Sequence, residues 1–457
     1  MNEINRSIKP LPTDEIDFSL PQIQNFSLDN KLKVYFVQKN DLPILQLNMI
    51  VNAGSKFDPN DKKGLANLTA MLIDEGAGNY NALELSDEFD TLGSHFNVGA
   101  SQDNIFLSLQ TLTENFEKSL DLFSMVITKP HLNQTDFERE RRKVLIKILQ
   151  LKDEPDQIAD AAYEYLIFGK DNPYSSITLG GEKSVNKISN EDIKIFYDLY
   201  FKPNNSALII VGDSKIDELK DYLNFFLVKW NHGEAKSIFI NKASRYKTQI
   251  FLIHKEGAVQ SEIRIGHLSS ERSEEDYYSK ILLNNILGGQ FSSRINLNLR
   301  ENKGYTYGAS SRFTYYKNSA HFVVSTSVGS ENTGNAVKEI MNELYSIRNG
   351  AEQKELDFAK ASAIRRFPSN FETNKQIASN LTAKYIFSLP DDYFNNYIEK
   401  IKNVSLEEIN LAAEENIFPE ESIILVVGDK NKILSQLENL NLGELKLIEY
   451  PFNNQIK

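Results

Sequence analysis

The histidine and cysteine content limits the metal and nucleophile chemistry that the chain could perform. There are no cysteines, which excludes disulfides, thiolate metal ligands and a cysteine nucleophile. The histidines are widely separated, and none has another histidine three or four residues away with an acidic neighbour that could act as a base. Each is therefore expected to be a hydrogen-bonded strand or loop residue; they are His95, His131, His232, His254, His267 and His321.

Arg300 and Tyr307, in the stretch "NLRENKGYTYGASSRF", are candidates for contact with a substrate. We expect a helix that ends near Lys303, with Gly304 directly after it, and a strand that begins at Tyr305. Arginine offers a fixed, always charged donor fork and tyrosine a neutral hydroxyl donor. Because Arg also suits a helix C-terminus and Tyr suits a strand, the pattern alone leaves a structural role open.

The stretch "GLANLTAMLIDEG" is predicted to form a helix from Gly64 to Glu75, since its apolar residues recur at intervals of three and four. Asn67 is a polar side chain in the first turn of this helix. It is a third candidate for chemistry.

These candidates are positioned by a unit that occurs twice in the sequence. "ISNEDIKIFYDLYFKPNNSALIIVGD" starts at residue 188, and "VSLEEINLAAEENIFPEESIILVVGD" starts at residue 404, an offset of 216. Each copy is predicted to be a capped helix, a proline-marked break, a buried strand and a Gly-Asp turn, with Ser189 and Ser405 as the N-caps. "VYFVQK" from Val34 and "IFLIHK" from Ile250 are strands that match at the same offset.

The repeat predicts a domain duplication in an α+β fold. Each of two homologous αβ domains should contain a mostly antiparallel sheet covered by helices. The proposed division is an N-terminal arm (1–24), a first domain (25–232), a linker (233–247) and a second domain that carries Arg300 and Tyr307 (248–457).

Composition narrows the possible partners and location. The net charge of −12 argues against a nucleic-acid binder. No apolar run is long enough for a spanning helix, so no membrane association is expected. Because no signal peptide is visible, we expect the cytoplasm, or the periplasm if the N-terminus was trimmed.

Several stretches in this order resemble the insulinase/pitrilysin family of zinc metallopeptidases, in its short two-domain form. They are "NAGSKFDPNDKKGLANLTAML", "FERERRKVLIKIL", "FGKDNPYSSITLGG", "YFKPNNSALIIVGD" and "LGGQFSSRINLNLRENKGYTYGASS". The resemblance spans roughly residues 25 to 440.

The resemblance implies a zinc site that this chain has lost. Active members carry His-x-x-Glu-His on the helix after "Gly-Leu-Ala" and a further Glu ligand some 76 residues on, with an accessory Glu before it. Here the two His positions are Asn67 and Met71, the base position is Ala70 and the distant ligand position is Lys147. Only the accessory Glu is retained, as Glu140. An ammonium cannot bind a metal, so we expect no catalytic zinc in this chain.

The resemblance also implies a function for the second half. Active members have an Arg and a Tyr seven residues apart that hold the substrate carbonyl, and Arg300 and Tyr307 match that spacing, whereas Tyr305 does not. The chain is thus expected to be the zinc-less subunit of a heterodimeric metallopeptidase, inactive alone, whose homologous partner brings zinc and whose substrates are peptides. The alternatives are a structural or binding subunit without a role in catalysis and, least favoured, a self-sufficient zinc peptidase.

Overall fold

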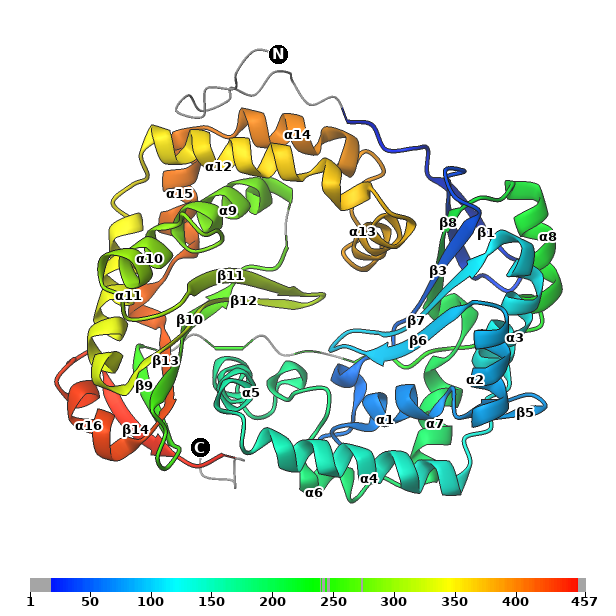
Figure 1. Cartoon of the computed structure of the whole chain (residues 1–457), viewed down its shortest axis with the longest axis horizontal. Helices are drawn as coiled ribbons and strands as arrows, with labels where there is room; N and C mark the ends of the chain where they lie inside the picture. The colour runs from blue at the N-terminus through cyan, green and yellow to red at the C-terminus, as the bar shows by residue number, and fades with distance from the viewer. Residues whose placement is uncertain (1–17, 239, 241–242, 245–246, 273, 451–457) are drawn as a thin grey trace, which may run out of the picture.

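The computed structural model describes residues 18–238, 240, 243–244, 247–272 and 274–450. Two six-stranded sheets are the centres of two halves (Figure 1). Because the described residues begin at residue 18, the predicted arm (1–24) lies largely outside them. Part of the predicted linker (233–247) lies outside them as well. Within the described part of the chain, no helix has both the length and the apolar character needed to cross a membrane.

The strands of the first sheet lie in the order β1-β2-β8-β3-β7-β6, and all neighbours are antiparallel except β2 and β8. The bounds are β1 Gln24–Ser27, β2 Lys33–Gln38, β3 Ile44–Val51, β6 His95–Ala100, β7 Ile105–Leu112 and β8 Ser206–Gly212, with a separate small hairpin of β4 Gly76–Ala77 and β5 Tyr80–Asn81. The helices of this half are α1 Leu65–Leu72, α2 Ala82–Thr91, α3 Phe116–Thr128, α4 Gln134–Leu151, α5 Pro155–Phe168, α6 Glu182–Val185, α7 Asn190–Tyr200 and α8 Ile216–Leu227.

The second sheet repeats this arrangement in the order β11-β12-β10-β13-β9-β14, with parallel pairs on both sides of β9. Its strands are β9 Gln249–His254, β10 Gln260–Ser269, β11 Ala309–Tyr316, β12 Ser319–Gly329, β13 Ile423–Gly428 and β14 Glu444–Ile448. The helices of this half are α9 Glu274–Leu287, α10 Arg294–Asn296, α11 Thr333–Ile347, α12 Gln353–Arg366, α13 Asn374–Ile386, α14 Tyr393–Asn403, α15 Leu406–Asn416 and α16 Lys430–Glu438, and a π-helical turn, η5 Leu297–Asn302, follows α10.

The matched sequence segments occupy equivalent places, which confirms the predicted α+β fold with mostly antiparallel sheets. β2 pairs in parallel with β8 as β9 pairs with β13. The capping boxes are also present: Ser189 Oγ accepts from the Asp192 N–H, and Ser405 Oγ accepts from the Glu408 N–H.

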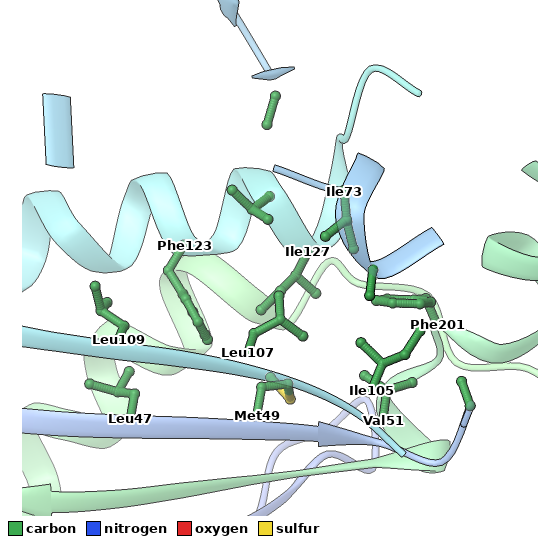
Figure 2. Packing of buried hydrophobic residues seen from close by; sticks show 14 of the residues in the cluster. Leu47, Met49, Val51, Ile73, Ile105, Leu107, Leu109, Phe123, Ile127 and Phe201 are labelled. Carbon is green, nitrogen blue, oxygen red and sulfur yellow. The ribbon is translucent and has the colours of Figure 1, made fainter. Parts of the chain in front are cut away.

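The alternation of apolar side chains along the central strands fills two different cores. Leu47, Met49 and Val51 of β3 face helices of their own half, where they meet residues such as Phe123 and Ile127 (Figure 2). The opposite face of this sheet, which includes Ile50, belongs to the core of the second half, and α13 packs there on β3 and β8. In return, α5 of the first half packs on β10 and β13. Each sheet is therefore covered on one face by a helix from the other half.

Candidate functional site

The helix that should carry the zinc ligands is α1, and its start is fixed by a buried carboxylate. Gly64 adopts φ of +104°, a region that favours glycine. The Asp58 carboxylate accepts hydrogen bonds of 2.8 Å from the N–H groups of Gly64 and Ala66. Burial raises the pKa of Asp58 to about 7, although these hydrogen bonds oppose the shift. The local sequence thus preserves the metal helix as a structural element.

The side chains at the ligand positions do not form a metal site. Asn67 Nδ2 lies 3.5 Å from Met71 Sδ, and Ala70 is buried and has no group that could act as a base. Lys147 is exposed on α4, which packs against α1. Across the described residues, no group of three or more His, Asp or Glu side chains could hold a metal ion. An amide, a thioether and an ammonium therefore do not fit the zinc ion that the family implies.

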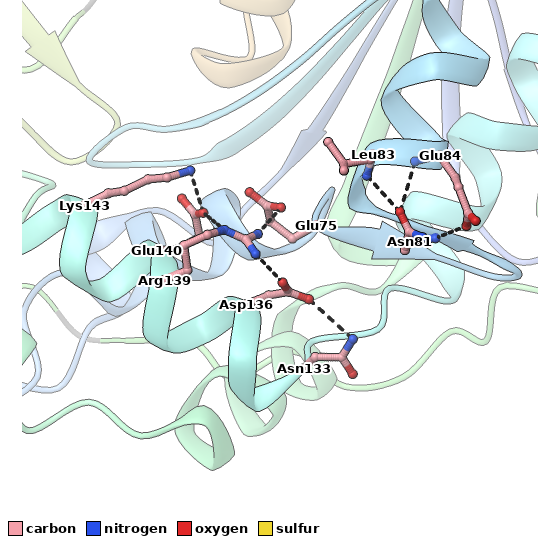
Figure 3. A network of polar contacts seen from close by, with 9 residues as sticks. All are labelled: Glu75, Asn81, Leu83, Glu84, Asn133, Asp136, Arg139, Glu140 and Lys143. Atoms are coloured by element: carbon pink, nitrogen blue, oxygen red, sulfur yellow. Dashed lines mark hydrogen bonds and ion pairs between the residues drawn. The ribbon is translucent and has the colours of Figure 1, made fainter.

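Glu140 is instead part of a network of charges between α4 and the turn after α1 (Figure 3). Its side chain is 3% exposed and accepts from Arg139 Nε at 3.1 Å and from Lys143 Nζ at 2.7 Å. Arg139 also pairs with Asp136 and with Glu75. Burial, together with the nearby Glu140, raises the pKa of Glu75 to about 7 and that of Asp74 to about 6. The retained glutamate is thus paired within α4, and Arg139 links this helix to the turn after α1 through Glu75.

Arg300 and Tyr307 lie in the second half, on the segment that joins α10 to β11. Arg300 is in η5, where its side chain is 36% exposed. The guanidinium carbon lies 4.4 Å from the centre of the Phe291 ring, and Nε lies 3.5 Å from Glu301 Oε1. Tyr307 is 93% exposed, and its hydroxyl has no hydrogen-bond partner among the described residues. Both side chains are available to a molecule outside this chain.

The prediction that a strand begins at Tyr305 is wrong, because β11 begins at Ala309. The Thr306 hydroxyl donates to the Gly308 carbonyl and accepts from the Gly308 N–H, which closes a local turn. Asn296 Oδ1 then accepts from the Ala309 N–H at the start of the sheet. Tyr307 therefore extends from a loop. Tyr305 packs partly buried against the core, so the structure separates the two tyrosines.

The structure does not bring this pair to α1 of the same chain. Figure 1 shows α10 and α1 on opposite sides of the molecule. The two sets of sequence-predicted site residues therefore belong to two separate surfaces.

The expectation that every histidine is hydrogen-bonded is wrong for His321. It is buried on β12 against the rings of Tyr163, Phe168 and Tyr316, and neither ring nitrogen has a partner among the described residues. Burial lowers the pKa of His321 to about 3, so this residue is neutral and contributes to packing. By contrast, His267 Nε2 accepts from the Phe418 N–H.

Sequence reasoning missed a buried polar junction that joins the two halves. The Asp103 carboxylate accepts from Lys56 Nζ at 2.7 Å, from the Tyr174 hydroxyl at 2.8 Å and from the Lys317 N–H at 2.9 Å. Nearby, the Tyr316 hydroxyl donates to Glu164 at 2.7 Å. These residues come from separate parts of the sequence, so no local pattern indicates their contact.

Comparison with known proteins identifies the family. The model of the insulinase family (peptidase family M16) matches residues 34–171, and the model of the peptidase M16 inactive domain matches residues 187–363. These two models of one family together match more than half of the chain, which belongs to this family of peptidases.

The relatives include both inactive and peptidase-named proteins. The "non-peptidase homolog YmxG" of Helicobacter pylori is 24% identical over 88% of this chain and 93% of its own length. The crystal structure of a peptidase M16 inactive domain from Pseudomonas fluorescens has a TM-score of 0.84 and 26% identity, over 89% of this chain and 98% of that one. The structure of a protease from Helicobacter pylori has a TM-score of 0.83 at 20% identity, over 89% of this chain and 100% of that one, which shows the fold alone. The chain is a peptidase-like member of the family without the metal-binding residues at the expected positions.

Proposed function

We propose that this chain is the non-zinc-binding subunit of a heterodimeric zinc metalloendopeptidase. The observation that carries the proposal is the exposure of the Arg300 guanidinium and the Tyr307 hydroxyl in a chain whose own metal positions hold Asn67, Ala70, Met71 and Lys147. The partner would be a homologue that supplies His-x-x-Glu-His and binds the zinc.

The chemistry of the pair suits a shared site. A guanidinium and a phenol can both donate a hydrogen bond to the carbonyl oxygen of a scissile peptide bond. Both hydrogen bonds become stronger as negative charge develops on that oxygen. Phe291, which lies against the Arg300 guanidinium, limits the orientations of this side chain. The zinc of the partner would polarise the same carbonyl and activate a water.

The substrate would be an extended peptide added to the edge of a sheet. β6 and β11 are edge strands, each paired on one side within the described residues. Tyr307 lies two residues before β11, so a peptide on this edge would pass the pair.

The test is to mix the chain with a His-x-x-Glu-His homologue from the same genome and to measure cleavage of an unfolded peptide. Removal of one oxyanion donor typically lowers kcat by about 10²-fold or more, and we expect that loss for Arg300→Ala and for Tyr307→Phe. Arg348→Ala and Tyr345→Phe, on the same half, are controls that should leave cleavage unchanged. Unchanged activity of both site variants in the mixture would refute the proposal.

The alternative is a structural or binding subunit of the same fold. The relative that is named a non-peptidase homolog favours it. In that case the purified chain would form a stable homodimer, and no peptidase activity would arise with any homologue.

A further inference from the structure

Arg272, in the connection between β10 and α9, occupies an unusual environment outside the surfaces described above. Its guanidinium carbon lies 4.1 Å from the centre of the Tyr277 ring, 4.8 Å from that of Phe387 and 5.4 Å from that of Tyr393. Arg272 Nη2 donates to the Tyr393 hydroxyl at 2.8 Å. Three aromatic rings thus fix the orientation of this cation.

The charge of Arg272 is not matched by an anion in the part of the chain that the structure describes. Among the described residues, no carboxylate lies within 4.0 Å of its guanidinium, and its buried Nε has no hydrogen-bond partner. The other arginines that are largely buried differ in this respect. Arg264 pairs with Asp160 at 2.6 Å, and Arg294 pairs with Glu355 at 2.6 Å. A partly desolvated cation without a counter-charge is a candidate for anion binding.

A cavity of about 340 Å³ opens beside this guanidinium. Besides Arg272 and the three rings, its walls come from the turn Ser388–Leu389–Pro390 after α13. Ser388 adopts φ of +53°, and the Leu389 N–H donates to the Lys384 carbonyl at 3.0 Å, which closes the helix end. This turn places Phe387 over the guanidinium. The cavity has the size of small-ligand sites.

We propose that this cavity binds a carboxylate that is attached to an apolar or aromatic group. One guanidinium supplies a single positive charge, and no lysine lines the cavity, which suits a monoanionic carboxylate better than a phosphate dianion. The rings of Tyr277, Phe387 and Tyr393, with Leu389 and Pro390, accommodate the hydrocarbon part. The carboxylate could come from a free small acid or from the C-terminus of a peptide that ends in an apolar residue.

The first experiment uses the unmodified chain and calorimetric titration. The probe is 3-phenylpropionate, and its neutral amide is the matched control. We expect saturable binding of the acid and at least tenfold weaker binding of the amide, because the amide lacks the charge that pairs with Arg272. Equal binding of the two compounds, or no saturable binding of the acid at millimolar concentrations, would overturn the proposal.

The second experiment tests the residue. Arg272→Gln should weaken binding of the acid at least tenfold, and Arg272→Lys should weaken it less, since an ammonium keeps the charge and loses the fork. Arg366→Gln removes an exposed arginine away from the cavity and should have no effect. Near-ultraviolet circular dichroism checks that the aromatic cluster of each variant is intact. If folded Arg272→Gln binds the acid as the unmodified chain does, the proposal fails.

A third titration identifies the source of the carboxylate. A short peptide that ends in Phe is compared with the same peptide carrying a C-terminal amide. Binding of the free-acid peptide alone assigns the site to peptide C-termini, and binding of 3-phenylpropionate without either peptide assigns it to small acids. Saturable binding of both peptides with equal affinity would refute recognition of a carboxylate.

Discussion

The surface of α1 and α4 and the segment around Arg300 are the two regions that the family resemblance marks as candidate site residues, and they differ in burial and in charge pairing. In the first, Ala70 is buried and the Glu140 carboxylate is bound by two cations, although Lys147 on the same surface is exposed. The second extends outward, with Tyr307 almost fully exposed. A group that stabilises a fold is buried and paired, whereas a group kept for a ligand must remain accessible. The first surface therefore contains buried and paired groups, and the second is accessible to an external molecule, as the proposed function requires.

The largest effect is expected from restoring the base position, with Ala70→Glu. Ala70 is 1% exposed, so the longer side chain must displace its neighbours and bury a carboxylate without a partner. We expect a loss of about 3 kcal/mol in the free energy of unfolding, measured by urea denaturation. Tyr307→Glu, which places the same side chain on the exposed segment, is the control and should change stability little. An unchanged urea midpoint for Ala70→Glu would mean that the α1 surface is open after all.

A smaller effect, which depends on pH, is expected at Asp74. Its pKa in the fold is about 6, raised by burial, against a model-peptide value near 3.9. The folded state therefore binds this proton more tightly than the unfolded state does. The stability that protonated Asp74 contributes is fully present below pH 4 and is lost as the pH rises through 6. Asp74→Asn should leave stability unchanged at pH 4 and raise it by on the order of 2 kcal/mol at pH 7.5, as measured by denaturation at both values. If Asp74→Asn changed the free energy of unfolding by the same amount at both pH values, the raised pKa of Asp74 would be contradicted.

The charge network between α4 and the turn after α1 should contribute less to the free energy of unfolding. Glu140→Ala removes the acceptor of Arg139 and Lys143. It also relieves the repulsion with Asp74 and Glu75. We therefore expect the free energy of unfolding to fall by only about 1 kcal/mol. Glu301→Ala removes the exposed neighbour of Arg300 and should change stability by no more than a few tenths of a kcal/mol. Thermal unfolding of Glu140→Ala and Glu301→Ala measures the two losses in the free energy of unfolding. Equal losses would mean that the two surfaces do not differ in how much their charges stabilise the fold.

The duplicated architecture could be predicted from the sequence because its signals are local. The two capped helices and the strands after them keep their residues in the same order at one offset, so each copy supports the other. The exchange of α5 and α13 between the halves could not be predicted, since a helix that covers a foreign sheet has the same apolar face as one that covers its own.

The candidate site, like the fold, could be predicted from the sequence only in part. The replaced metal positions follow from the family resemblance, which places its motif on two sequence stretches. The exposure of Tyr307 does not, because it depends on the turn that Thr306 and Gly308 close before β11. Arg272 carried no sequence signal, since its three aromatic neighbours come from three helical or turn segments.

The smallest effect on stability, and the sharpest separation of the two surfaces, is expected at Arg300 and Tyr307. Tyr307→Phe removes a hydroxyl without a partner in the described structure, and Arg300→Ala removes a half-exposed side chain whose ion pair with Glu301 is weak. Each should shift the free energy of unfolding by less than about 0.5 kcal/mol. Denaturation of the isolated chain measures this, and the same preparations enter the peptide-cleavage mixture. A variant that unfolds normally but abolishes cleavage assigns its side chain to the shared site, whereas a loss of several kcal/mol would mean that the residue supports the fold of its own chain.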